Sequence, residues 1–221
     1  NEVDLVPADQ LGATEATTDW YAVFGAVTCY RTTTATQQSD LVAAAAELAD
    51  EAGFPLLIDV RPGLVVLDSG KDLWEAEAHG LDVDFVELAA HLQAAARERG
   101  ATAEPTLPRF VQVFLDAADV AAVRDFWCAA LGYADDPRAG VTDLVDPRRL
   151  DPVFVFQELD RADTARRQQR NRIHVELSVP SASAPDRLAT ALAAGGQLLD
   201  ETPTEWRIAD PEGNELVIAD A

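Results

Sequence analysis

Two short runs decide the fold of this chain: Phe110-Val111-Gln112-Val113-Phe114-Leu115 and Ile173-His174-Val175-Glu176-Leu177. Both runs are rich in apolar residues, and each carries a polar side chain near its start. A helical stretch follows both runs and ends on glycine, at Gly132 in the first half and at Gly195 in the second. Both halves then reach an Asp-Pro pair before a final apolar strand: Asp146-Pro147 and Asp210-Pro211.

This self-similarity predicts two β-α-β-β-β units in tandem, and a repeat of this kind outweighs any local motif. Two such units would curl their sheets around one shared concavity, which we call the cup. Gln112 and His174 hold the same place in the first strand of each unit, so their side chains would point into it. The fold class predicted for the chain is α+β.

Three motifs in this half support a family resemblance: Asp119 to Gly132 (DVAAVRDFWCAALG), Asn171 to Leu177 (NRIHVEL) and Asp210 to Glu215 (DPEGNE). The half resembles the vicinal-oxygen-chelate family of glyoxalases, bleomycin-resistance proteins and extradiol dioxygenases, and it looks most like the glyoxalase-like subgroup. The match covers roughly half the chain, and its motifs fall in the family's order. The resemblance implies a small-molecule site in the cup.

The resemblance also implies four metal ligands, from the first and last strands of each unit. Gln112 and His174 match the two first-strand positions, whereas Val217 stands where the family has a glutamate. Glu215 lies two residues earlier on the same strand face, and Gln157 is the polar candidate in the first unit. One imidazole, one displaced carboxylate and two amides are poor donors for a divalent ion. We therefore predict no tightly held metal or other cofactor, with Gln112, His174 and Glu215 as the ligands if a metal binds.

His174 and Glu176 are the candidate catalytic residues. A polar side chain in an apolar strand costs free energy unless it is paired, so His174 is either a ligand or acid-base group or a hydrogen-bonded structural residue. Glu176 faces the same way and would orient the imidazole or accept from a substrate. The candidate substrate-binding residues are Gln112, Phe114, Gln157, Trp206 and Glu215, with Trp206 as a pocket wall. Trp127 belongs to a helical apolar stripe and is expected in the core.

One basic island lies between the two units: Arg161, Arg166, Arg167, Arg170 and Arg172. Guanidinium groups suit carboxylate or phosphate, so the island is either an anion-binding rim over the cup or a solvated loop that balances nearby acids. We favour the solvated loop.

The sequence is divided as follows: a loosely ordered lead over 1–17, a first domain over 18–100, a linker over 101–108 and the repeat domain over 109–221. The first domain reads strand-helix-strand-strand-helix, with a hairpin at Pro62-Gly63. It resembles pterin-4a-carbinolamine dehydratase in this order and in its landmarks: Trp20, the helix from Ser39, Pro55, Gly80-Leu81 and Asp84.

The first domain departs from that family at its histidines. The family pair is replaced by Gly53 and Phe54, the third position falls in Leu67–Ser69, and His79 is displaced from it. The dehydration needs imidazoles to move protons near neutral pH. We predict a retained fold with lost catalysis.

Composition limits the partners. Of 221 residues, 17 are basic and 39 acidic, which gives a formal charge of −22 and disfavours nucleic acid or an anionic membrane surface. Cys29 and Cys128 lie in different halves with no CxxC pattern, which favours a reduced, cytoplasmic setting. No apolar run approaches a membrane span, and the first residues lack a signal-peptide core. A homodimer is compatible with these features.

Three functions remain open. In the first, which we favour, the cup binds a small organic molecule without metal-dependent chemistry, as resistance-type members of the family do. In the second, Gln112, His174 and Glu215 serve a metal-assisted lyase, isomerase or dioxygenase. In the third, the chain is an interaction protein with vestigial sites. Metal content separates the first two, because only the second requires a bound ion.

Overall fold

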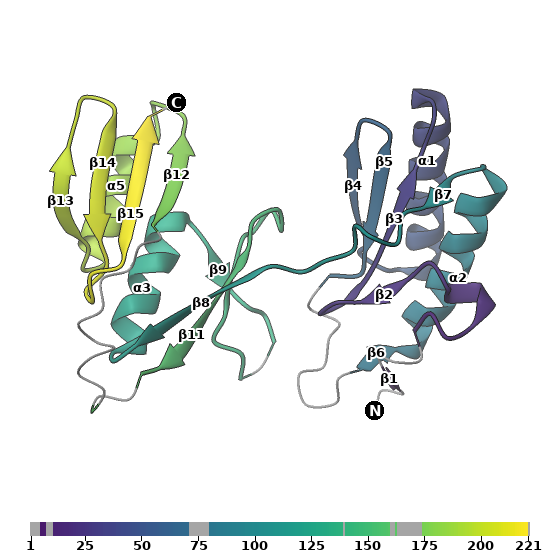
Figure 1. Cartoon of the computed structure of the whole chain (residues 1–221), viewed down its shortest axis with the longest axis horizontal. Helices are drawn as coiled ribbons and strands as arrows, with labels where there is room; N and C mark the ends of the chain where they lie inside the picture. Colours follow the sequence, from purple (N-terminus) through teal and green to yellow (C-terminus); the bar gives the residue numbers. More distant parts are fainter. Residues whose placement is uncertain are drawn as a thin grey trace. The chain divides into compact units, whose positions relative to one another are not determined.

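The chain forms two compact units, Asn1–Phe110 and Val111–Ala221, in a computed structural model (Figure 1). The structure describes residues 5–7, 11–70, 80–138, 140–159, 162 and 174–220. Both units combine helices with sheets, which confirms the predicted α+β class. Among the described residues, no helix combines the length and the apolar composition that crossing a bilayer requires.

The first unit contains an antiparallel sheet in the order β2-β3-β5-β4, with β7 paired to β3. Its elements are β1 (Leu5–Pro7), η2 (Glu15–Thr17), β2 (Tyr21–Ala22), β3 (Ala26–Arg31), α1 (Ala35–Ala52), β4 (Leu57–Arg61), β5 (Leu64–Asp68), β6 (Gly80–Asp82), α2 (Val83–Glu98) and β7 (Thr102–Ala103). The predicted hairpin is β4-β5. Helix α1 begins four residues before the predicted Ser39, because the Thr34 side chain accepts a hydrogen bond from the Gln37 N–H and caps it.

The core of the first unit lies between its sheet and its two helices. Trp20 is 1% exposed, packs edge-on against Phe85 at 5.5 Å between ring centroids, and donates from Nε1 to the Ala89 carbonyl. Phe54 also packs against Phe85, and Gly53 ends α1 with a φ of 65°. Gly53 and Phe54 therefore both have structural roles in this unit, one as the end of a helix and the other in aromatic packing.

The first unit extends beyond the predicted 18–100 at both ends. Leu11 and Thr17 are buried, and Gln93 Nε2 donates to the Glu15 carbonyl, so part of the predicted lead packs against α2. At the other end Ala101 is buried, and the Glu104 N–H donates to the Cys29 carbonyl at 2.8 Å. The first residues of the predicted linker thus belong to this unit.

The second unit is a repeat of β-α-β-β-β. Its elements are β8 (Gln112–Ala117), α3 (Val120–Leu131), β9 (Ala134–Asp135), β10 (Leu144–Val145), β11 (Val153–Glu158), β12 (Val175–Val179), α5 (Ala184–Ala193), β13 (Gln197–Glu201), β14 (Glu205–Ala209) and β15 (Glu215–Asp220). The two sheets run β8-β11-β10-β9 and β12-β15-β14-β13, so in each repeat the first strand pairs in parallel with the last. The predicted repeat is confirmed.

One core joins the two repeats of the second unit. Helices α3 and α5 pack against each other, and a single buried cluster contains residues of both helices and of both sheets. Trp127 of α3 is central to it and is 1% exposed, as predicted. Each sheet therefore has one face turned to this shared core and one face turned away from it (Figure 1).

The aspartate of each Asp-Pro pair is buried and holds a turn. Asp210 is fully buried and accepts from Trp127 Nε1, from the N–H groups of Glu212 and Asn214, and from Asn214 Nδ2. Asp146 holds the matching turn of the first repeat and accepts from three main-chain N–H groups. The shared motif thus fixes the entry into the last strand of each repeat.

Asp146 should make the second unit acid-sensitive. Burial on its own would raise its pKa, but hydrogen bonds from the Arg148 N–H and guanidinium and from the Leu150 and Asp151 N–H groups lower the pKa below its ordinary 3.8. A lowered carboxyl pKa stabilises the fold above the unfolded value, and that contribution is lost as the pH falls below about 4. Urea unfolding between pH 3 and 7 should show a smaller loss for Asp146→Asn than for wild type. Equal losses would contradict this.

Candidate functional site

The first open face belongs to the sheet β8-β11-β10-β9, which we call the Gln112 sheet. On β8, Val113, Leu115 and Ala117 pack in the core, so strand alternation turns Gln112 and Phe114 outward. Phe114 is 52% exposed. On the neighbouring strand β11, Val155 pairs with Phe114. The exposed Gln157 lies two residues further along β11 and therefore faces the same side as Val155. Three predicted substrate-binding residues therefore share one face.

The second open face belongs to the sheet β12-β15-β14-β13, which we call the Glu176 sheet. Val175 and Leu177 pack against the core, so the exposed Glu176 points the other way. His174 is also exposed and immediately precedes β12. On β15 the buried residues are Leu216 and Ile218, which leaves Glu215 and Val217 on the open face.

Arg207 completes a row across the Glu176 sheet. Glu176 of β12 pairs with Val217 of β15, which in turn pairs with Arg207 of β14. Arg207 NH1 lies 3.9 Å from Glu215 Oε2. A hollow of about 210 Å³ opens here and is lined by Asp200, Glu201, Thr202, Glu205, Arg207 and Val217. The face thus presents carboxylates as acceptors beside one guanidinium donor.

The two sets of predicted site residues lie on different sheets of the chain. Gln112, Phe114 and Gln157 are on one open face, whereas Glu176 and Glu215 are on the other. Because α3 and α5 cover the opposite face of each sheet, the predicted meeting of Gln112 with His174 in one cup does not occur within a single chain.

Trp206 differs from its prediction as a pocket wall. It pairs with Ile218, a buried residue, and packs against the core cluster. Its neighbour Arg207 takes the outward position, because alternating residues of a strand face opposite sides. The sequence analysis did not include Arg207, Glu205 or the end of β13 among the site residues. The alternation in Glu205-Trp206-Arg207-Ile208 does indicate that Glu205 and Arg207 share the outward face.

The Glu176 sheet does not fit a tightly held divalent metal. Val217 occupies the strand position where the resemblance requires a carboxylate, and the cationic Arg207 stands beside it and near Glu215. A divalent ion would be repelled by that guanidinium and would lack the carboxylate that the resemblance places at the Val217 position. In the part of the chain that the structure describes, no three His, Cys, Asp or Glu side chains come together as a metal site.

Two sequence-based hypotheses lie outside the described residues. The basic island, Arg161, Arg166, Arg167, Arg170 and Arg172, falls there, and so does His79 of the first unit. Both stay predictions.

Comparison with known proteins assigns a family to the second unit. Residues 112–219 match the family described as a glyoxalase-like domain, whereas no curated protein matches the chain. Hypothetical protein SA1046 from S. aureus is 13% identical over 50% of this chain and 92% of its own, with a TM-score of 0.41. A glyoxalase/bleomycin resistance protein/dioxygenase family enzyme from Burkholderia phytofirmans PsJN is 18% identical over 49% and 95%, with a TM-score of 0.38. The fosfomycin resistance protein FosX from Listeria monocytogenes is 12% identical over 51% and 90%, with a TM-score of 0.40. Residues 112–219 of this chain are a glyoxalase-like domain.

Proposed function

We propose that the glyoxalase-like domain binds a small organic molecule on the open face of the Glu176 sheet, without a tightly held metal. The observation that carries this proposal is the hollow of about 210 Å³ over Val217 and Arg207. It lies at the strand position where the family resemblance places the reacting centre. Ligand sites are typically concave, with few polar groups that fix the orientation of the ligand.

The polar groups of this face favour a ligand with hydrogen-bond donors or a positive charge. Asp200, Glu201 and Glu205 line the hollow together with a single cation, Arg207, and Glu176 stands in the same row of the sheet. Carboxylates only accept hydrogen bonds, so a ligand must supply the protons. Arg207 would hold an acceptor atom of the same ligand. His174 and Glu176 are the residues proposed to contact the ligand at the β12 edge.

A homodimer would complete the site. Val111 and Phe114 are each 52% exposed, and in the described sheets β8 and β12 are edge strands. An exposed aromatic on a sheet face is costly in water, and an edge strand is open to pairing with another chain. We propose that a second copy sets its Gln112 sheet opposite the Glu176 sheet of the first. Gln112, Phe114 and Gln157 would then face His174 and Glu215 across two equivalent cups.

The metal-dependent alternative, a lyase, isomerase or dioxygenase, needs a donor set that Arg207 and Val217 do not supply. The third alternative, an interaction protein with vestigial sites, is favoured by no particular contact. For the first unit we propose a dehydratase-like domain without catalysis. This proposal is supported by the roles of Gly53, which ends a helix, and Phe54, which packs against Phe85. Neither residue can transfer protons as an imidazole does.

The proposal predicts that binding depends on His174 and Arg207. A library with matched cationic, neutral and anionic fragments is screened by thermal shift, and cationic or donor-rich fragments should dominate the hits. His174→Ala and Arg207→Gln should each weaken a hit by about 10- to 100-fold, since a buried ligand group loses its partner, which costs about 1–3 kcal/mol.

His91→Ala is the matched control, because His91 is an exposed histidine on α2 of the first unit. It should leave binding unchanged. Hits that tolerate both His174→Ala and Arg207→Gln would show that the ligand binds elsewhere.

A further inference from the structure

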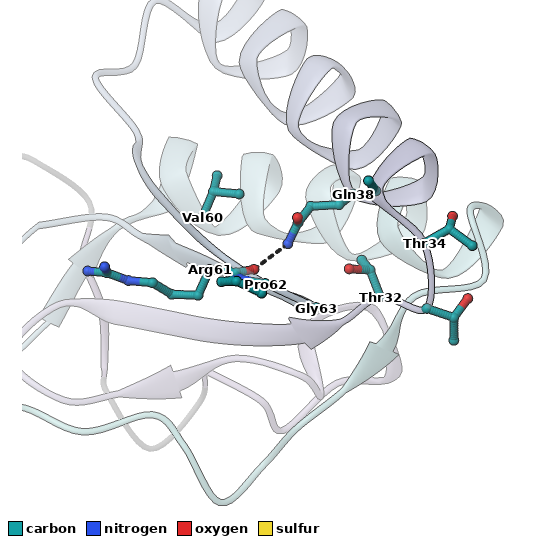
Figure 2. A pocket seen from close by; sticks show the side chains of 9 residues that line it. Thr32, Thr34, Gln38, Val60, Arg61, Pro62 and Gly63 are labelled. Atoms are coloured by element: carbon teal, nitrogen blue, oxygen red, sulfur yellow. Dashed lines mark hydrogen bonds between the residues drawn. The ribbon is translucent and has the colours of Figure 1, made fainter.

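A second candidate site lies in the first unit, at the start of helix α1 (Figure 2). A cavity of about 520 Å³ opens between the end of β3, the first turn of α1 and the turn that joins β4 to β5. Its lining consists of Thr32 to Ala35, Gln38 and Val60 to Gly63. It shares no residue with the proposed ligand site of the glyoxalase-like domain and is independent of that proposal.

The start of α1 is an uncompensated positive end. The helix has 18 residues and no acidic residue in its first turn. Thr34 Oγ1 accepts from the Gln37 N–H, and Gln37 Oε1 in turn accepts from the Thr33 N–H. The N–H groups of Ala35 and Thr36 have no intrahelical acceptor, because they belong to the first turn. The aligned peptide dipoles add roughly half a positive charge at this end.

Thr32 gives an independent sign of a ligand. It is 8% exposed, and its Oγ1 is buried without a hydrogen-bond partner. Figure 2 shows its side chain directed toward the middle of the lining residues, on the side where Gln38 Nε2 donates to the Arg61 carbonyl. An unpaired buried hydroxyl is unfavourable by about 1–3 kcal/mol, so such groups call for a partner.

The charges of the lining residues favour a negatively charged ligand. In a chain with a formal charge of −22, the nine lining residues include no carboxylate, and Arg61 is their one charged member. The Arg61 guanidinium points away from Thr32 in Figure 2 and pairs with Asp59 at 3.3 Å. Both side chains are largely exposed, so this pair contributes little and leaves Arg61 free to turn. The hollow of the glyoxalase-like domain, lined by three acids, has the opposite character.

We propose that this cavity binds a small oxyanion, a phosphate or carboxylate group of a larger ligand. The N–H group of Ala35 and the hydroxyl of Thr32, two residues of the lining, would donate to its oxygens. The Arg61 guanidinium would neutralise it from the rim. Helix starts of this kind bind anions through main-chain N–H groups and the helix dipole together.

The test follows the amide signals of the ¹⁵N-labelled full chain by NMR. Inorganic phosphate is titrated in one arm and acetate in the other, at constant ionic strength. The Ala35 and Thr36 signals should shift and saturate. The anion that saturates at the lower concentration identifies the group, phosphate or carboxylate.

Variants separate binding from folding. Thr32→Val should weaken binding by about tenfold or more, since it removes a donor to a charged group. Its ligand-free melting temperature should match or exceed that of wild type, because an unpaired buried hydroxyl is removed. Thr32→Ser, which keeps the hydroxyl, and Thr102→Val on β7, which lies outside the cavity lining, should bind as wild type. Arg61→Gln should also weaken binding. Shifts that stay linear with anion concentration, or saturation unchanged in Thr32→Val, would overturn the proposal.

Discussion

Asp210→Ala is expected to destabilise the glyoxalase-like domain by about 3–5 kcal/mol, as a buried acceptor shared by several donors is lost. The carboxylate is fully buried and receives Trp127 Nε1 at 3.0 Å and Asn214 Nδ2 at 2.7 Å. It also receives the N–H groups of Glu212 and Asn214, each at 2.9 Å. Alanine would leave these donors buried and unpaired. The contact with Trp127 matters most, because it ties the last turn of the second repeat to the helix of the first.

Urea unfolding followed by tryptophan fluorescence measures this effect. Asp200→Ala is the matched control, because Asp200 is an exposed aspartate on β13 of the same domain. It should change the free energy of unfolding by less than about 0.5 kcal/mol. A loss in Asp210→Ala no larger than that of the control would refute the role given to this turn.

Trp20→Ala is expected to cost the first unit about 3–5 kcal/mol, the usual range for a large aromatic removed from a core. Trp20 is 1% exposed, contacts Phe85 edge-on and donates to the Ala89 carbonyl at 2.9 Å. Among the described residues, the core cluster of the first unit extends to Ala103 and that of the second begins at Val113. The loss should therefore be confined to the first unit.

Hydrogen exchange read separately for each unit distinguishes the outcomes. Amides of β3 and β5 should lose protection in Trp20→Ala, while those of β14 and β15 keep theirs. Tyr21→Ala, at an adjacent and exposed aromatic, should leave both sets protected. Equal loss of protection in the two units would show that they unfold as one.

The repeat could be predicted because it depends on local patterns. Three of these patterns each involve only adjacent residues: the apolar run Phe110–Leu115, the glycine at the end of α3 and the Asp-Pro turns. The Asp119 side chain caps α3 by accepting from the Ala122 N–H, and Gly132 ends it with a φ of 71°. Such signals act over a few residues, so they can be seen without the fold.

The candidate site was harder to predict, because it depends on which strands are neighbours. Arg207 is a candidate site residue because it pairs with Val217, and no local sequence pattern shows that β14 lies beside β15. The side to which Trp206 points was hard to predict for a similar reason, since shifting a strand by one residue exchanges its two faces. The separation of Gln112 from His174 follows from helix packing between the repeats, which is a long-range contact.

The most direct test of the account is the metal content of the purified chain, measured together with ligand binding. Protein prepared without chelator is analysed for zinc, iron, nickel and manganese, and the best thermal-shift ligand is then titrated with and without chelator. The account predicts far less than one metal ion per chain, the same affinity in both titrations, and weaker binding in His174→Ala than in His91→Ala. About one ion per chain, with binding abolished by the chelator, would contradict it and establish the metal-dependent alternative.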